Sequence, residues 1–453
     1  MRADTGGMAG SRSSWSQAHV RRLFWRAGFG ATPKEAALWA RKGQAATVKW
    51  LVDGGSPKLA GPPPRFKDGG RLDPVNEWGH DHLWWLDRMV RSQRPLEEKL
   101  TLFWHDHFAT TEQDRPLMLR QNNAIRNRAF GRFPDLLRAM TTDSAMQLFL
   151  SLVDNDKDSP NENFARELME LFTLGGGYTE RDVREAARAL TGWRAKWTTR
   201  GFGGLYYDRE RHDAGVKRIL GQRGRFDWED VLRIVTTHPR HAPFLVTKLW
   251  GFFVTRPPSK SAVKRLARTY TSSGLLIRPV VREILGDKAL YADLDAPDMV
   301  KSPVVFVAGA LRTTGNGIDR DAWTWLCDSM GQLLFHPPSV AGWDWATAWM
   351  SSNTMRSRFM AANYLTDIAG IAVKEGTGDP TLTPAQAVEL ALNSSGRPWI
   401  AGSTRAELES MARNYFDDMT KDWQQGEPKR ERAEMLQRML RHLLLTGPDA
   451  HLH

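Results

Sequence analysis

The sequence predicts a mainly α-helical protein with little or no β-sheet. Apolar residues recur at helical spacing along most of the chain, and helix-start and helix-stop residues flank these segments. The chain has 453 residues, 41% hydrophobic and 25% charged, which is enough for a large core without disulfides or metal. We predict a disordered tail over 1–18, one multi-helix domain with long ordered glycine- and aromatic-rich loops over 19–370, and a helical extension over 371–453.

The first clear helical signals lie in the N-terminal quarter. Thr32 is placed to cap a helix that has Pro33 at its first position, and the helical pattern runs over 33–53. Gly43 interrupts this pattern, so we expect two short helices there. A further helix is predicted over 95–108, within LEEKLTLFWHDHF and the proline before it.

The segment NENFARELMELFTLGG over 161–176 predicts a helix with Asn161 at its N-cap and glycines at its C-terminal end. Thr179 and Asp182 form a capping-box pattern that opens the next helix. Residues 194–226 lack helical periodicity and are rich in glycine, aromatic residues and arginine. We interpret them as a long ordered loop with room for a small hairpin, and such loops are often functional.

The C-terminal third contains a second aromatic, proline- and glycine-rich loop over 330–350. A linker is predicted around 374–383, and it precedes a last helical part over 384–446. We find no internal repeat of fixed period.

The single cysteine, Cys327, excludes an intramolecular disulfide and lies among apolar residues, which favours a buried small side chain over a reactive thiol. No run approaches the roughly 20 apolar residues of a membrane span. The N-terminal residues lack the apolar stretch of an export signal, so we expect a cytoplasmic protein.

The net charge of +11 and the sequence pI of about 9.8 are compatible with nucleic acid or another anionic polymer as a partner. The alternative is positive charge spread over the whole surface. The densest basic stretch, PKRERAEMLQRMLRH over 428–442, is interrupted by acids and leucines. The sequence therefore favours the spread charge over a polymer-binding site.

The motif FWHDHFATT places His105 and His107 two residues apart. On a regular helix they point about 200° apart and cannot share a metal ion. His107 falls on the apolar face, whereas His105 falls on the polar side, which predicts one core and one surface histidine. If the helix ended at Trp104, extended backbone would bring both imidazoles to one side, where a metal could bind.

Asn163, Glu167 and Glu170 project from one face of the predicted 161–176 helix. Two carboxylates and an amide could bind a cation or supply a general base. The alternative, which the spacing alone favours, is a solvated helix face on which Arg166 pairs with Glu170.

In the loop RHDAGVK, His212 lies beside Asp213, and Lys217 follows four residues later. A loop histidine next to a carboxylate could be an oriented general base, but the same pair also occurs as a turn feature. In FHPPSVAGWDW, Trp343 and Trp345 could wall a ligand pocket or close the core. Phosphate-binding, dinucleotide-binding, zinc-protease and nucleophile-elbow motifs are absent from the sequence.

These segments occur in a fixed order, together with FPDLLRAMTTDSAMQLFL and KSPVVFVAGALR. The series over residues 19 to 365 resembles the bacterial family called domain of unknown function 1800. The resemblance implies a largely helical fold, no established activity, and a partner protein, because relatives often neighbour a second uncharacterised gene product. Many relatives have Asn where this chain has Asp106, and relatives often begin with an export signal. The positions that fall on the family's motifs are His105, His107, Asn163, Glu167, Glu170, His212, Asp213, Lys217 and Trp343.

Our leading hypothesis is an enzyme-like polar site for metal-assisted or acid/base hydrolysis, with no cofactor or metal identified. Its catalytic groups would be His105, His107, Glu167, Glu170, His212 and Asp213, and its substrate-binding groups Asn163, Lys217 and Trp343. The competing hypothesis is a non-catalytic binding or assembly protein in which these residues form a structural hydrogen-bond network. A third hypothesis is a binder of anionic polymers.

Overall fold

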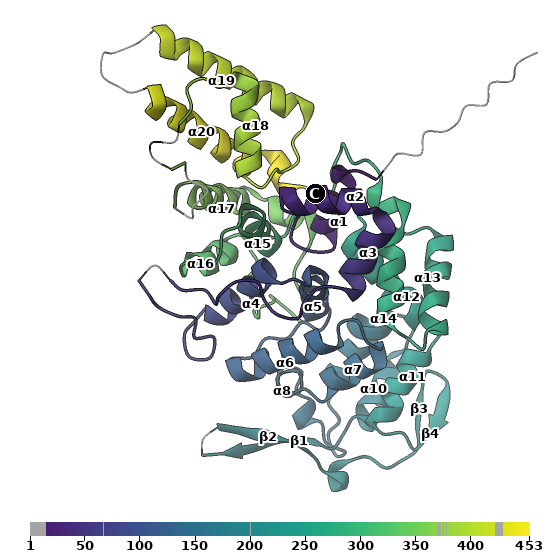
Figure 1. Cartoon of the computed structure of the whole chain (residues 1–453). Coiled ribbons are helices and arrows are strands. Elements are labelled where there is room, and N and C mark those ends of the chain that lie inside the picture. Colours follow the sequence, from purple (N-terminus) through teal and green to yellow (C-terminus); the bar gives the residue numbers. More distant parts are fainter. Residues whose placement is uncertain are drawn as a thin grey trace, which may run out of the picture.

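The computed structural model describes residues 15–66, 68–199, 201–368, 373, 374, 376, 378–421 and 429–453. These residues form α-helices α1 to α20, several short 3-10 or π-helical segments, and two small hairpins (Figure 1). The predicted mainly α fold is confirmed. Within the described residues every helix is too short or too polar to span a bilayer.

The helices of the N-terminal half are α1 (Gln17–Arg26), α2 (Pro33–Lys42), α3 (Gln44–Asp53), α4 (His80–Arg91), α5 (Pro95–His107), α6 (Arg115–Arg128), α7 (Phe133–Thr141), α8 (Ser144–Phe149), α9 (Asn163–Glu167) and α10 (Glu180–Ala189). Those of the C-terminal half are α11 (Trp228–Thr237), α12 (His241–Phe253), α13 (Lys260–Ser272), α14 (Ile277–Gly286), α15 (Pro303–Thr314), α16 (Ala322–Ser329), α17 (Ser352–Asn363), α18 (Pro384–Ser394), α19 (Gly402–Lys421) and α20 (Lys429–Thr446).

The local signals in the sequence set several of these boundaries. The Thr32 hydroxyl accepts the N–H of Glu35 at 3.2 Å and caps α2. Gly43 has φ +83°, a left-handed conformation that favours glycine, and it separates α2 from α3 as predicted. The Thr179 capping box at the start of α10 is also present.

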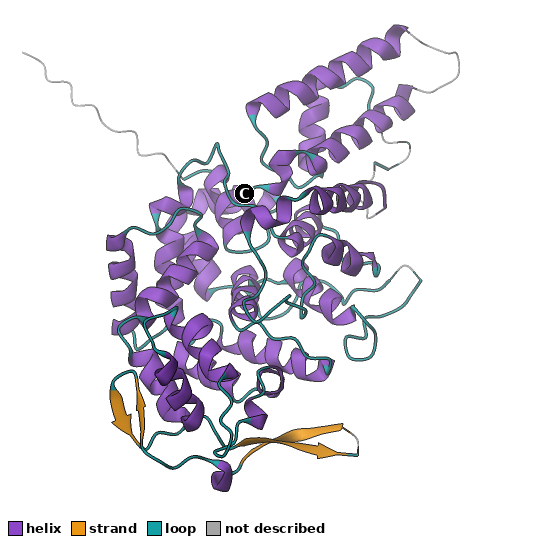
Figure 2. Ribbon diagram, turned by 180° about the vertical axis from the view of Figure 1, so that it is seen from behind, coloured by secondary structure: helices purple, strands orange, loops and turns teal. Residues whose placement is uncertain are grey.

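Residues 194–226, predicted as a loop with room for one hairpin, contain two. Strands β1 (Trp193–Thr198) and β2 (Gly201–Tyr207) pair antiparallel, as do β3 (Lys217–Ile219) and β4 (Gln222–Gly224). Figure 2 shows both hairpins at the end of the molecule opposite α18, α19 and α20.

Helix α5 lies between the two larger parts of the core. Leu100, Phe103 and Trp104 pack into the part that includes α1, α7, α12 and α14. Leu102 packs into the second part, with α4, α15 and α16. Cys327, in this second part, is fully buried as predicted, and burial raises the pKa of its thiol.

Helices α18, α19 and α20 enclose a smaller apolar cluster of their own and stand together in Figure 1. The chain then returns to the larger part of the molecule. The N–H of Lys301 donates to the carbonyl of His451 at 2.8 Å, and the N–H of His453 donates to that of Met299 at 2.9 Å. Arg26 of α1 donates to the carbonyl of His453 at 2.8 Å, so the last described residues are fixed against the first helix.

The described chain begins within the range predicted as a disordered tail. The indole N–H of Trp15 donates to the carbonyl of Trp39 at 3.2 Å, and α1 starts at Gln17. Residues 1–14 of that predicted tail lie outside the described residues, as do parts of the predicted 374–383 linker.

Trp25 on α1 packs directly on Gly309 of α15. A Cβ added at Gly309 would lie 2.2 Å from a ring carbon of Trp25, which is closer than two carbons can approach. Gly251 on α12 is a useful contrast, since a Cβ there has no neighbour within 4 Å.

We expect Gly309→Ala to lower the free energy of unfolding by about 1–3 kcal/mol, because the indole must move out of a packed position. Gly251→Ala, also within a helix, should raise it by up to about 1 kcal/mol, because alanine favours a helix over glycine. Urea denaturation followed by circular dichroism measures both values. Stabilisation by both variants would contradict the packing described for Trp25.

Candidate functional site

Helix α5 continues through His107, so the two histidines of FWHDHFATT lie on opposite sides of one regular helix. The alternative in which the helix ends at Trp104 and both imidazoles share one side is wrong. His105 and Asp106 both contact the loop over 330–350, whereas His107 contacts the segment that follows α9.

His105 is fully buried, whereas its helical position predicted a surface residue. That side of α5 is covered because its acidic residue is neutralised: Glu98 pairs with Arg126 at 2.8 Å and with Arg88 at 3.1 Å. The prediction assumed that a polar helix face is exposed to solvent. A polar face can instead be buried when its charged side chains form ion pairs, as Glu98 does here.

The surroundings of the His105 ring are aromatic. Its centroid lies 5.0 Å from Trp85, 5.6 Å from Phe335 and 5.7 Å from Trp343. Neither ring nitrogen has a hydrogen-bond partner among the described residues. Burial, with a smaller contribution from His336, lowers the pKa of His105 to about 3, so the ring is neutral.

His107 faces the other part of the core and is also buried, as predicted. Its Nε2 lies 3.1 Å from the carbonyl oxygen of Phe172, so Nε2 carries the proton and donates it to that carbonyl. The ring packs edge-on against Phe108 with centroids 4.6 Å apart. Burial lowers the pKa of His107 well below 6.5 and keeps the ring neutral.

The acceptor belongs to a π-helical segment, η2 (Leu168–Leu174), which continues α9 without a break. Such segments are rare and often occur at functional sites. Gly175 ends the segment at φ +66°. The last carbonyls of a helix have no partner within it and need donors from elsewhere.

Three side chains supply those donors to three successive carbonyls of η2. Lys248 Nζ donates to the Leu171 carbonyl at 3.4 Å, His107 to that of Phe172, and His241 Nδ1 to that of Thr173 at 3.0 Å. Lys248 and His241 come from α12, whereas His107 comes from α5. We call these three side chains the η2 clamp. Only His107 of the three was predicted as a site residue, because nothing in the sequence HAPFLVTKLW indicates a contact with a π-helix.

The carboxylates of the NENFARELMEL segment lie away from the clamp. Glu170 is exposed and accepts the hydroxyl of Tyr178 at 3.0 Å. Glu167 is half-buried, and burial together with the charge of Glu170 raises its pKa. The predicted Arg166–Glu170 pair is wrong, because Arg166 bonds to Glu180 at 2.7 Å and Glu162 at 3.1 Å instead.

Asn163 is exposed, and its backbone N–H donates to the Asn161 side chain at 2.9 Å. The N-cap of α9 is Glu162 rather than the predicted Asn161. The side chain of Asn161 thus binds a backbone group at the start of the helix, one residue before the cap.

The RHDAGVK segment forms a closed turn. His212 Nδ1 lies 3.1 Å from the Thr191 carbonyl, and Asp213 accepts from Arg188 at 2.7 Å. Lys217 is buried, and its ammonium group donates to the carbonyls of Asp213, Gly215 and Phe226. All of these bonds lie within or next to the turn, where they fix its backbone.

Asp106 anchors the aromatic loop over 330–350. Its carboxylate accepts the backbone N–H of Trp343 and the indole N–H of Trp345, each at 2.9 Å. A Cβ at Gly342 would lie 2.3 Å from the same carboxylate, so glycine is required for this close approach. Burial raises the pKa of Asp106 to about 6, although both hydrogen bonds oppose the shift. Trp343 itself is buried against His105.

Asp106 was not among the site residues predicted from the sequence, where it appeared only as a position at which many relatives have Asn. The sequence does contain one relevant signal. The segment AGWDW places a glycine next to two tryptophans, whose N–H groups can donate hydrogen bonds to a carboxylate such as that of Asp106. Among the described residues no group of three or more His, Cys, Asp or Glu side chains could hold a metal ion. His105 contacts aromatic rings, His107 a carbonyl, and His212 a separate turn.

The fold and these contacts define a class: a mainly helical protein whose motif side chains bind its own backbone and loops. The chain belongs to the family described as "Protein of unknown function (DUF1800)", whose profile matches residues 22–451. The match reaches beyond residue 365, where the motif resemblance stopped, and so includes α18, α19 and α20. No curated protein and no solved structure matches the chain.

The neutral His105 ring predicts a specific pH dependence. Its pKa is about 3 in the folded protein and about 6.5 when unfolded, so between these values the unfolded chain binds a proton that the folded chain does not. Its stabilising contribution is complete above pH 6.5 and is lost as the pH falls.

We therefore expect His105→Phe to reduce the slope of unfolding free energy against pH by about 1.4 kcal/mol per unit between pH 6 and 4. Urea denaturation at closely spaced pH values measures the slope. Phe335→Leu is the control, since it disturbs the same aromatic cluster without removing a titrating group. An unchanged slope in His105→Phe would contradict a neutral buried imidazole.

Proposed function

We propose that this chain is a non-catalytic binding or assembly protein, in which the histidines and lysines of the motifs fix helix packing. The observation that carries the proposal is the η2 clamp. His107 uses Nε2 on the Phe172 carbonyl, and its Nδ1 is buried without a partner among the described residues. A general acid or base must reach the proton that it transfers, directly or through one water, and this ring is enclosed by protein.

The surroundings of the other motif residues support the same proposal. The Lys217 ammonium binds three backbone carbonyls, and Asp213 binds Arg188 and the N–H of Gly215. These side chains form their hydrogen bonds with other groups of the same chain, which is expected of a structural hydrogen-bond network. The partner protein and the cytoplasmic location expected from the sequence stay predictions.

One observation favours an acid/base site as a second candidate. The pKa of Glu167 is raised by burial and by the nearby charge of Glu170, and groups whose pKa is shifted by burial and a neighbouring charge are common at catalytic sites. Glu170 accepts a hydrogen bond from the hydroxyl of Tyr178. This candidate would use only the surface of α9 and η2, without the histidines of the leading sequence hypothesis.

The proposal predicts that His107→Phe lowers the free energy of unfolding by about 1–3 kcal/mol, because the Phe172 carbonyl stays buried without a donor. His107→Gln should lose less, since its amide can still donate. Hydrogen–deuterium exchange should accelerate across 168–176 in His107→Phe, and urea denaturation gives the stabilities.

Glu167→Gln is the matched control, because it alters a motif side chain on the partly exposed face of the same segment. We expect it to change stability by less than about 0.5 kcal/mol. Wild-type stability and exchange in His107→Phe would reject the structural role of the histidine and leave Glu167 as the better candidate for chemistry.

A further inference from the structure

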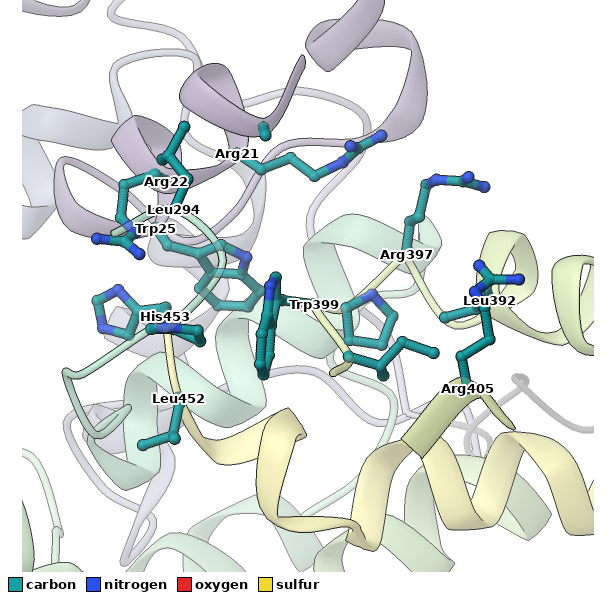
Figure 3. A pocket seen from close by; sticks show the side chains of 14 residues that line it. Arg21, Arg22, Trp25, Leu294, Leu392, Arg397, Trp399, Arg405, Leu452 and His453 are labelled. Atoms are coloured by element: carbon teal, nitrogen blue, oxygen red, sulfur yellow. The ribbon is translucent and has the colours of Figure 1, made fainter. Parts of the chain in front are cut away.

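A cavity of about 220 Å³ lies between α1 and the segment that joins α18 to α19 (Figure 3). Its lining combines arginines with tryptophans, prolines and aliphatic side chains, and none of the described residues that line it is Asp or Glu. The lining includes Arg21, Trp25, Arg397, Trp399, Arg405 and Leu452. None of them is part of the η2 clamp or of the turn around Lys217.

The lining of the cavity includes four arginines, Arg21, Arg22, Arg397 and Arg405, so its side chains carry a net positive charge. Burial and the charge of nearby Arg397 lower the pKa of Arg21. Arg397 and Arg405 both pair with one carboxylate, Glu389, which does not line the cavity. Arg22 donates to the backbone carbonyls of Ala292 and Asp293, and burial lowers its pKa although the nearby charges of Asp298 and Asp293 oppose the shift.

Arg21 is the arginine best placed to bind a ligand. Its guanidinium donates to the neutral side chain of Gln17 at 2.9 Å, and among the described residues it makes no ion pair. The Nε atom of Arg21 is buried and has no hydrogen-bond partner among the residues that the structure describes. A guanidinium in this state gains more from an added anion than one already paired, because charge-assisted hydrogen bonds are the stronger kind.

Two tryptophans give the cavity flat walls. Trp25 is held in place by Gly309 behind it and by Lys301, whose Nζ lies 4.0 Å from its ring centroid. Figure 3 shows Trp399 beside Trp25, and Arg397 and Arg405 farther from Trp25, beyond Trp399. Arg397, two residues before Trp399, has φ +56°, a conformation that non-glycine residues rarely adopt and that is often found at binding sites.

We propose that this cavity binds a small molecule with one planar ring and one anionic group, either a carboxylate or a phosphate. The ring would pack on Trp25 and Trp399, and the anion would bind Arg21. The volume is below the roughly 300–1,000 Å³ of drug-sized sites, which favours a single-ring ligand. The inference deepens the proposed binding role by naming a ligand class, but it depends on different residues, so either proposal can fail alone.

Isothermal titration of the full chain tests the ligand class with four probes: phenyl phosphate, benzoate, neutral benzamide and inorganic phosphate. We expect at least one of the two aromatic anions to bind at least tenfold more tightly than benzamide and than inorganic phosphate. Tighter binding of phenyl phosphate assigns a phosphate group, and tighter binding of benzoate assigns a carboxylate. No binding of either at millimolar concentration, or equal binding of benzamide, would overturn the proposal.

Variants then test the location. Arg21→Gln should weaken the aromatic anion about tenfold or more, because it removes a charged donor, and Arg21→Lys should restore part of the affinity. Trp399→Leu should weaken the aromatic anions while leaving inorganic phosphate unchanged. Arg120→Gln, at an exposed position of α6, is the matched control and should bind like the wild type. Melting temperatures within a few degrees verify folding, and unaltered binding by Arg21→Gln and Trp399→Leu would place the site elsewhere.

Discussion

The hydrogen bonds of the η2 clamp join η2 to α5 and α12 within the larger part of the core. A π-helical end exposes carbonyl oxygens in positions that its own backbone does not satisfy, and an unsatisfied buried carbonyl costs about 1–3 kcal/mol. Here α5 contributes His107, and α12 contributes Lys248 and His241. His241 also binds the hydroxyl of Tyr270 on α13 at 2.9 Å, so the same set of polar contacts reaches a third helix.

Helix α5 connects this network to the rest of the molecule through three consecutive residues. Successive side chains on a helix turn by about 100°, so His105, Asp106 and His107 face three directions. His105 packs into the aromatic cluster of α4 and the 330–350 loop, Asp106 binds the backbone and indole of that loop, and His107 binds η2. His105 and Asp106 thus both hold the 330–350 loop, and His107 holds η2, so packing constrains all three consecutive positions of this short polar motif.

Local signals in the sequence predicted much of the fold. The caps at Thr32 and Thr179, the break at Gly43 and the continuous helix through His107 follow from short-range rules about helix ends and periodicity. What escaped prediction depends on contacts between distant segments. His105 was predicted at the surface because it shares a helix face with the charged residue Glu98. In the structure Arg126 pairs with Glu98 inside the core, and this face of the helix is buried. The π-helix and the donors on α12 have no periodic signature, and the arginine cavity joins residues from both ends of the chain.

The contact between α1 and the last described residues has a consequence for biosynthesis. The buried guanidinium of Arg26 donates to the carbonyl of His453, a residue 427 positions later in the chain. At translation rates of about 5–20 residues per second, roughly 20–90 s separate the synthesis of these two residues. During that interval the guanidinium of Arg26 on α1, which is buried in the folded protein, lacks the acceptor that His453 provides. Helix α1 can thus reach its final environment only after the ribosome has produced residues 451 to 453, whose backbone groups bond to Met299 and Lys301.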